Sequence, residues 1–435
     1  MNTETAWPPS LWAETAVAAT SYPPLRGETA SDVVVIGAGF SGLSSALHLA
    51  RRGIRSILIE GKAIGWGASG RNNGQVIPTL SAIEPAAIVK RHGETGERLV
   101  HLIGGSADLL FRLAREENID CEAEQSGWYQ PAHSPDRLKL SERRVRAWQS
   151  FGFPAELIDK EASARLTGSD FWYGGMYNPT GGHINPLSLA RGLGESCRRE
   201  GVEIFENSIV VGIERTGGRW RVSTRHGSVV AQAVVLATNA YTDVLFPRLA
   251  PSISRSIVPI ISWQVATRPL DADLRASVMP GRQAISDTRA DLHFFRYDSQ
   301  HRIVTGGAVP GPWRVRQRIR ELAIRKITSA FPQMGEVNFT HMWNGQLGMT
   351  MDRFPHFHQL GPDFWSWTGC NGRGVALAIS IGREFAALVS GAPRNEIALP
   401  LTEPDTIPFQ PVSRHFAPLV YAWHKRRDKK PLKLS

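Results

Sequence analysis

The fold of this chain is decided by a stretch near its N-terminus, which begins Asp32-Val33-Val34-Val35-Ile36-Gly37-Ala38-Gly39-Phe40-Ser41-Gly42. Its first five residues form a short, almost wholly apolar run, as in a parallel strand buried on both faces. From Ser41 to Arg52 the apolar residues recur with the period of a helix that has one buried face. Gly53 ends this helix, and Ile57 to Glu60 repeats the strand pattern. The stretch therefore predicts a β-α-β unit.

The glycine spacing in this unit has a physical reason. Gly37 permits the tight turn out of the strand, Gly39 lets a pyrophosphate approach the backbone, and Gly42 lets the helix sit close to the strand. The N–H groups and the dipole of a helix N-terminus attract phosphate. Glu60 ends the second strand, where a carboxylate can bind both ribose hydroxyls and disfavours a 2′-phosphate. The pattern predicts an adenine dinucleotide and counts against NADP.

A second glycine-rich loop bears on which dinucleotide binds. It runs from Gly65 to Gln75 and contains Gly67-Ala68-Ser69-Gly70-Arg71-Asn72-Asn73-Gly74. A cofactor whose ribityl chain and flavin ring extend across the sheet needs close backbone approach there, whereas a simple NAD dehydrogenase has no need of this loop. The alternative is a surface loop without a ligand.

Two later segments suit the same cofactor. Val234 to Thr238 predicts another buried strand, and its end in Asn239-Ala240-Tyr241 permits a second approach to the cofactor. The turn Gly372-Arg373-Gly374 precedes a predicted helix from Val375 to Ser390. Its N–H groups and Arg373 would stabilise negative charge on a reduced flavin ring. The alternative is that this turn only caps the helix and binds no ligand.

Residues 250–350 show a different pattern. Apolar or alternating runs at Ile257 to Thr267, His293 to Arg296 and Ile303 to Gly307 predict antiparallel strands in a separate sheet. An arginine-rich helix is expected from Val315 to Phe331. This part is the natural candidate for shaping a substrate pocket.

Two further segments of the chain, a predicted helix and the N-terminal arm, lie outside these strands and turns. Glu94 to Asn118 predicts one long amphipathic helix. The first 30 residues carry Trp7, Trp12 and Tyr22 among prolines without a helical or strand period. They predict an arm that packs across the domain surface.

Composition narrows the class of protein. The chain has 435 residues, enough for two intertwined domains, and its 42% hydrophobic and 21% charged residues are typical of a globular protein. Cys121, Cys197 and Cys370 are widely spaced, which argues against a disulfide framework and fits a reducing compartment. The sequence shows no secretory signal and no run long enough to span a bilayer. A cytoplasmic protein without transmembrane segments is expected.

The net charge of +10 does not by itself indicate nucleic-acid binding. Basic residues are interleaved with acidic ones, except in the tail from His424 to Lys430. That tail is expected to be a solvated end or a peripheral contact with an anionic membrane. His341, His356 and His358 lack the ligand spacing of a metal site, so no metal is expected.

The chain resembles the D-amino-acid-oxidase-type family of FAD-dependent oxidoreductases, most of all its gamma-glutamylputrescine oxidase branch. The motifs that carry this resemblance are the first glycine turn, Glu60, the Gly-Ala-Ser-Gly-Arg-Asn loop, Gly181 to Pro186, Leu236 to Tyr241 and the turn at Gly372. The resemblance spans nearly the whole chain. It implies an α/β fold, with a discontinuous Rossmann-like FAD-binding domain and a second substrate domain built on a mixed, mainly antiparallel sheet.

The resemblance also implies domain bounds. They are an N-terminal arm at 1–30, an FAD-binding domain at 31–85, 180–250 and 340–395, a substrate domain at 86–179 and 251–339, and a C-terminal extension at 396–435.

FAD is the implied cofactor. It is expected to bind non-covalently, because the segment from Trp343 to Asp352 has no cysteine where sarcosine-oxidase relatives attach flavin. The family usually carries His where this chain has Arg373, which would change how charge at the flavin is stabilised. The residues expected to bind FAD are Gly37, Gly39, Phe40, Ser41, Gly42, Glu60, Gly67, Ala68, Ser69, Arg71, Asn73, Gly74, Gln75, Val210, Thr238, Asn239, Gly372, Arg373, Gly374 and Val375.

The implied reaction is hydride transfer from a carbon that bears an amine, giving an imine that water hydrolyses to an aldehyde or keto product. Family enzymes mostly position an uncharged amine without a dedicated acid-base residue. The pocket candidates are Gln75, His183, Trp263, Arg296 and Trp343. Arg296 is chosen because a substrate carboxylate would bind a guanidinium. For each candidate, packing or surface pairing is the alternative.

Several functions remain open at this point. The favoured substrate is a gamma-glutamylputrescine-like amine, with D-amino acids, glycine and N-methyl amino acids as alternatives. The electron acceptor is O2 or, in a dehydrogenase, a quinone or a protein. A flavin-binding protein without turnover is the alternative from another class. The sequence does not indicate an oligomeric state.

Overall fold

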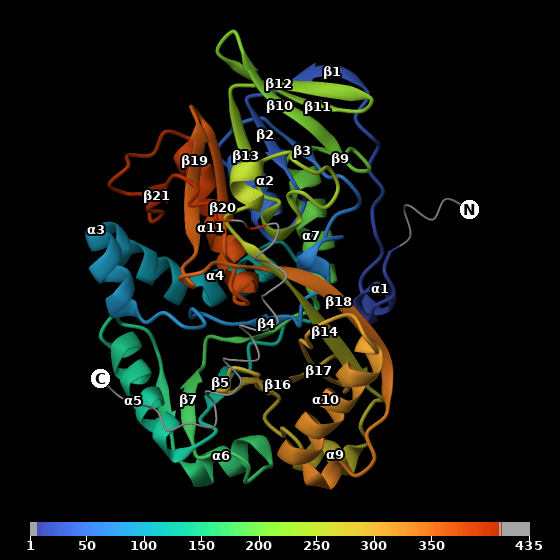
Figure 1. Ribbon diagram of the computed structural model, residues 1–435, viewed down its shortest axis with the longest axis vertical. Coiled ribbons are helices and arrows are strands. Elements are labelled where there is room, and N and C mark those ends of the chain that lie inside the picture. The colour runs from blue at the N-terminus through green and yellow to red at the C-terminus, as the bar shows by residue number, and fades with distance from the viewer. Residues whose placement is uncertain (1–6, 409, 411–435) are drawn as a thin grey trace.

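A mostly parallel sheet forms the upper half of the molecule in the computed structural model, which describes residues 7–408 and 410 (Figure 1). Its strand order is β21 (Leu401–Thr402), β19 (His356–Gly361), β20 (Phe364–Thr368), β13 (Ala233–Leu236), β2 (Val33–Ile36), β3 (Ser56–Ile59) and β9 (Glu203–Phe205). Every residue of β2, β3 and β13 is buried, which explains their unbroken apolar sequence.

The two faces of this sheet are covered differently. Val33 and Val35 pack among residues of the helices α2 (Phe40–Ala50), α7 (Pro186–Arg199) and α11 (Gly374–Val389). Val34 and Ile36 pack toward a second, four-stranded sheet. Its order is β1 (Gly27–Ala30), β12 (Gly227–Ala231), β11 (Arg219–Thr224) and β10 (Val210–Thr216), and it lies at the top of the molecule (Figure 1).

An eight-stranded sheet forms the lower half of the molecule (Figure 1). Its order is β18 (Phe339–Met349), β14 (Val258–Thr267), β17 (Ile303–Gly307), β16 (Phe294–Tyr297), β15 (Ala284–Ser286), β5 (Trp128–Pro131), β7 (Gly175–Asn178) and β6 (Glu156–Ile158). Its neighbouring strands are antiparallel except for β15 and β5. The predicted combination of a Rossmann-like sheet with a mixed, mainly antiparallel sheet is confirmed.

The two halves are joined by strands as well as by loops. A short pair, β4 (Gln75–Val76) and β8 (Gly182–His183), connects the second glycine-rich loop to the segment that precedes α7. The long strand β18 pairs with β14 in the lower sheet. The domain bounds given by the resemblance stay predictions.

The remaining helices lie around the two sheets. They are α3 (Pro85–Gly104), α4 (Ser106–Glu116), α5 (Pro135–Gln149), α6 (Lys160–Thr167), α8 (Pro251–Ser254), α9 (Ala272–Ser277) and α10 (Val315–Ala330). The single helix predicted from Glu94 to Asn118 is wrong, because α3 ends at Gly104 and α4 begins at Ser106, with Gly105 between them. None of the helices within residues 7–408 is long and apolar enough to cross a membrane.

The N-terminal arm has more structure than its sequence indicates. Ser10 caps a short helix, α1 (Leu11–Thr15), by accepting a hydrogen bond from the Ala13 N–H at 3.0 Å. The arm then supplies β1 to the four-stranded sheet. Trp12 is fully buried rather than laid on the surface. The basic tail from His424 to Lys430 lies outside the described residues.

Close contact between α2 and the turn after β2 generates a prediction for Gly42→Ala. A Cβ atom at Gly42 would lie 1.9 Å from the Gly37 carbonyl oxygen, so α2 has to move away from the strand. The variant is expected to lose about 3 kcal/mol of unfolding free energy in urea titrations. Gly212→Ala is the control, since its Cβ would meet nothing nearer than 4.0 Å. Equal stability of the two variants would contradict this packing argument.

Four histidines give a second prediction, on acid stability. Burial lowers the pKa of His48 and His358 to about 4 and of His293 to about 3, and it holds that of His183 well below 6.5. Below about pH 6.5 the unfolded chain therefore binds more protons than the folded chain, and stability falls as the pH falls.

The test is His358→Gln, studied by urea unfolding at neutral pH and near pH 5. Without the His358 imidazole, the unfolding free energy is expected to fall by about 2 kcal/mol less between neutral pH and pH 5 than in the parent protein. The exposed His226→Gln serves as the control and is expected to behave like the parent protein. An unchanged pH dependence in His358→Gln would show that this ring is not kept neutral by burial.

Candidate functional site

The first glycine turn, Glu60 and the second glycine-rich loop meet at the N-terminus of α2. The Glu60 carboxylate accepts hydrogen bonds from the N–H groups of Ala38 at 2.8 Å and Lys62 at 2.9 Å. Burial raises the pKa of Glu60, and these backbone donors act in the opposite direction. The Ser69 hydroxyl accepts from the Phe40 N–H at 3.0 Å. The structure thus brings both glycine-rich segments to the helix end that the sequence predicts for a pyrophosphate.

The third cofactor segment lies at the N-terminus of α11. Asn371 fixes the turn, because its N–H donates to the Gly348 carbonyl at 3.0 Å and its side-chain oxygen accepts from the Thr350 N–H at 3.0 Å. Gly372 has a φ of +80°. Gly374 and Val375 form the first turn of α11.

Arg373 points from this turn toward the eight-stranded sheet. Its guanidinium lies 4.8 Å from the centre of the Trp128 ring and donates to the Ser286 hydroxyl at 3.4 Å. Burial lowers the pKa of Arg373 to about 9, so the group is still a cation at neutral pH. Trp128 also donates to Ser286, at 2.7 Å. Nothing in the local sequence of Trp128 or Ser286 indicates this contact, so neither residue was predicted for the site.

The end of β13 supplies further polar groups. Asn239 has a φ of +43°, a left-handed conformation that Asn tolerates better than most residues. Its side-chain oxygen lies 2.5 Å from the position that a Cβ of Gly348 would occupy. The Thr238 hydroxyl contacts that of Thr242 at 2.7 Å. Val210 is buried at the start of β10.

Several buried polar atoms near these segments form no hydrogen bond within the described chain. They are Arg71 Nε and Nη2, Asn73 Oδ1, and both side-chain polar atoms of Asn239. A buried polar group without a partner costs about 1–3 kcal/mol, so such atoms fit a polar ligand. All belong to residues that the sequence predicts for FAD. The residues present fit this cofactor, and their individual roles stay predictions.

The pocket candidates Gln75 and His183 lie side by side in the β4–β8 pair. The Gln75 amide donates to the carbonyls of Ile285 at 2.8 Å and Phe295 at 3.2 Å, which links the cofactor loop to the eight-stranded sheet. His183 Nε2 lies 3.2 Å from the Arg282 carbonyl. Burial and the Arg296 charge lower the pKa of His183, which keeps its ring neutral.

Arg296 has a different role from the one predicted. Its guanidinium is fully buried and donates to three backbone carbonyls, those of Asn73, Tyr297 and Ile184, at 2.8–2.9 Å. These bonds leave it poorly placed to bind a substrate carboxylate. The Trp343 side chain is also hydrogen-bonded within the chain, since its indole N–H donates to the Arg71 carbonyl at 2.9 Å. Trp263 is only partly buried on β14.

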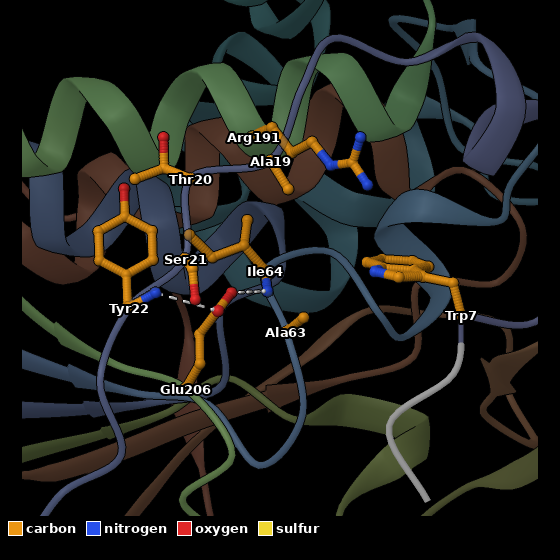
Figure 2. A pocket seen from close by; sticks show the side chains of 9 residues that line it. All are labelled: Trp7, Ala19, Thr20, Ser21, Tyr22, Ala63, Ile64, Arg191 and Glu206. Atoms are coloured by element: carbon orange, nitrogen blue, oxygen red, sulfur yellow. Dashed lines mark hydrogen bonds between the residues drawn. The ribbon is translucent and has the colours of Figure 1, made fainter. Parts of the chain in front are cut away.

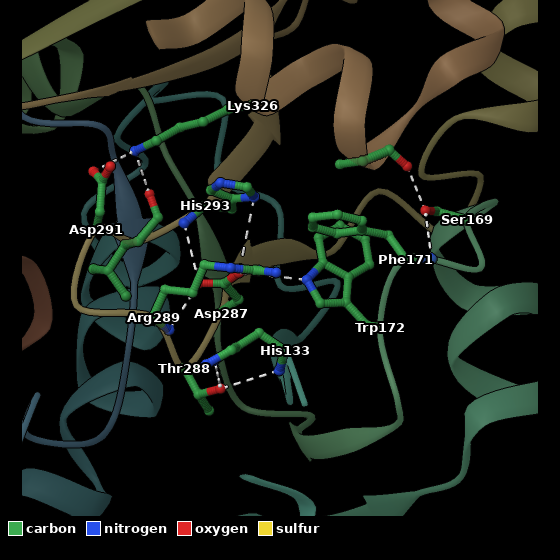
Figure 3. Close-up of polar contacts among 12 residues, drawn as sticks. His133, Ser169, Phe171, Trp172, Asp287, Thr288, Arg289, Asp291, His293 and Lys326 are labelled. Atoms are coloured by element: carbon green, nitrogen blue, oxygen red, sulfur yellow. Dashed lines mark hydrogen bonds and ion pairs between the residues drawn. The ribbon is translucent and has the colours of Figure 1, made fainter. Parts of the chain in front are cut away.

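A polar cluster supports the far end of β15 (Figure 3). Asp287 is fully buried and accepts hydrogen bonds from the N–H groups of Arg289 at 3.0 Å and His293 at 3.1 Å. It also forms an ion pair with the Arg289 guanidinium and accepts from Trp172 Nε1 at 3.5 Å. Burial raises the pKa of Asp287, and Arg289 opposes this shift. The cluster fixes the loop that follows Ser286, and sequence reasoning missed it.

A cavity of about 180 Å³ lies between the N-terminal arm, α7 and the loop after Glu60 (Figure 2). Within it Glu206 accepts hydrogen bonds from the Ile64 N–H at 2.7 Å and the Tyr22 N–H at 3.4 Å. Figure 2 shows Tyr22 and the Arg191 guanidinium on opposite sides of the cavity.

Comparison with known proteins identifies the family. The family model described as FAD dependent oxidoreductase matches residues 32–388. The chain belongs to the FAD-dependent oxidoreductase (DAO) family. The fold and the FAD cofactor of this family agree with the arrangement of the glycine-rich segments described above. The predicted resemblance is confirmed. Family membership implies FAD, an amine or amino-acid substrate and an electron acceptor.

Two curated relatives are similar along most of their length. The chain is 32% identical over 372 residues to the probable oxidoreductase OrdL of Haemophilus influenzae, covering 85% of each protein. It is 31% identical over 381 residues to the gamma-glutamylputrescine oxidoreductase of Escherichia coli, covering 86% of this chain and 88% of that protein. Among solved structures, the glycine oxidase of Geobacillus kaustophilus superposes with a TM-score of 0.71 at 20% identity, covering 84% of this chain and 96% of that one. This last likeness shows the fold.

Glu60→Gln tests the carboxylate at the end of β3. The charge-neutral amide is expected to weaken FAD binding about 10- to 100-fold, because a hydrogen bond to a charged group contributes about 1.5–3 kcal/mol. FAD affinity is measured by titration of the apoprotein. The matched control is Glu206→Gln, a carboxylate that also accepts from two backbone N–H groups but follows β9. If both variants bind FAD as the parent does, Glu60 does not contact the cofactor.

Proposed function

We propose that this DAO-family enzyme oxidises a primary or secondary amine, with a gamma-glutamylputrescine-like compound as the favoured substrate. The observation that carries the proposal is the bridge made by Gln75. Its amide holds both β15 and β16 directly beside the loop predicted for the flavin. A substrate held on the eight-stranded sheet would therefore meet the cofactor. The similarity to the Escherichia coli gamma-glutamylputrescine oxidoreductase supports this choice of substrate.

The proposed reaction removes a hydride from the carbon that bears the amine, and FAD, when bound, would supply the hydride acceptor. The carbon–nitrogen bond becomes an imine, and water hydrolyses the imine to an aldehyde or keto product with release of the amine nitrogen. The residues of this chain contribute mainly orientation and electrostatics. His183, the histidine among the pocket candidates, stays uncharged at neutral pH because burial lowers its pKa.

Two arginines have separate proposed roles. Arg373 places a cation at the turn before α11, where it would oppose negative charge that develops on the reduced cofactor. Arg71 presents Nε and Nη2 without a hydrogen bond inside the described chain, which suits an anionic part of the cofactor. Arg296 is assigned to holding the backbone and not to the substrate.

The substrate proposal is tested with the purified holoenzyme under nitrogen. The panel contains gamma-glutamylated polyamines, D-amino acids, glycine and N-methyl amino acids. A gamma-glutamylated polyamine is expected to bleach the flavin absorption at least about 10-fold faster than the other compounds, the ratio that about 1.4 kcal/mol of differential transition-state binding gives. Faster bleaching by an amino acid would reassign the substrate, and bleaching by none would favour a protein without turnover on amines.

The same substrate then identifies the electron acceptor. Peroxide formation in air indicates an oxidase, whereas reduction of a dye without peroxide indicates a dehydrogenase that serves a quinone or a protein. Non-covalent attachment is expected, and release of FAD into the supernatant after acid precipitation tests it.

A further inference from the structure

Four consecutive carbonyl oxygens of the second glycine-rich loop are each bound by a different donor. The pairs are Arg71 with Trp343 Nε1 at 2.9 Å, Asn72 with Trp12 Nε1 at 2.9 Å, Asn73 with Arg296 Nε at 2.8 Å, and Gly74 with the Ile184 N–H at 2.9 Å. Three of these donors are side chains, and they come from β18, α1 and β16. We call Trp12, Arg296 and Trp343 the carbonyl clamp.

The three side chains of the carbonyl clamp also pack on one another. The Arg296 guanidinium lies over the Trp12 ring at 4.4 Å, and the Trp343 ring meets Trp12 edge-on at 5.6 Å between centroids. All three are at most 3% exposed. Because the Trp12 ring contacts both Arg296 and Trp343, it orients these two donors in addition to supplying its own N–H.

The carbonyl clamp occupies the backbone acceptors of the loop. With the carbonyls occupied, the polar atoms of this loop that are buried without a partner are Arg71 Nε, Arg71 Nη2 and Asn73 Oδ1. Gly74 keeps the loop against its support, since a Cβ there would lie 2.2 Å from the Ile184 carbonyl oxygen. The backbone of the loop is therefore fixed by the chain itself, while these three side-chain atoms stay available to a ligand.

The arm that carries Trp12 is fastened close to this residue. The Val17 N–H donates to the Ser188 hydroxyl at 3.1 Å, and the Val17 carbonyl accepts from Arg191. Glu14 pairs with His341 on β18 at 2.7 Å. These bonds anchor the arm to both halves of the molecule, so Trp12 is placed independently of any bound cofactor.

We infer that Trp12 is a positioning residue of the cofactor site and that the N-terminal arm is a working part of that site. The Trp12 N–H and ring fix the loop from Arg71 to Gly74 in the conformation that receives the flavin cofactor. This inference rests on the proposed function for the identity of the cofactor. The carbonyl clamp itself rests on contacts within the chain.

Trp12→Phe removes the N–H and keeps an aromatic ring beside Arg296. FAD binding is expected to weaken about 10-fold, which corresponds to about 1.4 kcal/mol. The visible circular dichroism of the bound flavin is expected to change, and the backbone amides of residues 68–76 are expected to exchange hydrogen faster. Trp343→Phe is expected to act in the same direction, which provides a second variant if Trp12→Phe folds poorly.

The matched control is Trp220→Phe. Trp220 is also a buried indole that donates to a backbone carbonyl, that of Pro362 at 2.8 Å, but it lies in the four-stranded sheet. This variant is expected to lose similar thermal stability without any change in FAD affinity, flavin dichroism or exchange in the loop.

The outcomes separate the two proposals. If the clamp variants and Trp220→Phe match in FAD affinity, dichroism and loop exchange, the positioning role of Trp12 is overturned. If the parent protein binds no FAD, the proposed function fails, while the exchange comparison still decides whether Trp12 holds the loop.

Discussion

The close approach of one helix to one strand is the constraint on which the rest of this structure depends. α2 can lie against the turn after β2 only because Gly42 has no side chain, since a Cβ there would lie 1.9 Å from the Gly37 carbonyl oxygen. That contact sets the helix end, where the Ala38 N–H donates to Glu60 and the Phe40 N–H donates to Ser69. The first glycine turn and its contacts with Glu60 and Ser69 thus depend on one close packing contact.

The sequence predicts the upper half of the molecule well because its signals are local. Buried parallel strands are continuous apolar runs, and the glycine turn and Glu60 lie within one β-α-β unit. The second sheet also follows from alternating runs. The break at Gly105 was missed because one apolar face continues through both helices, and apolar periodicity does not mark an interruption of one residue.

The sequence predicts which segments meet at the candidate cofactor site. It predicts poorly which residues contact the substrate. Arg296 illustrates the reason, since a guanidinium bound to three carbonyls has the same sequence signature as one that awaits a carboxylate. The contacts of Trp128 with Ser286 and of Trp172 with Asp287 likewise join residues that are remote in sequence. The type of a residue indicates what chemistry it can perform. Tertiary contacts decide whether its hydrogen-bond donors are already bound within the protein.

The buried position of Trp12 has a consequence for the order of folding. The arm is synthesised before its partners, because Trp12 contacts Arg296 and Trp343, which follow hundreds of residues later in the chain. Contacts of such sequence separation form slowly, because a long loop has to close before they stabilise anything. The arm is therefore expected to be among the last segments to become ordered, and the carbonyl clamp stays incomplete until the strands that carry Arg296 and Trp343 have formed.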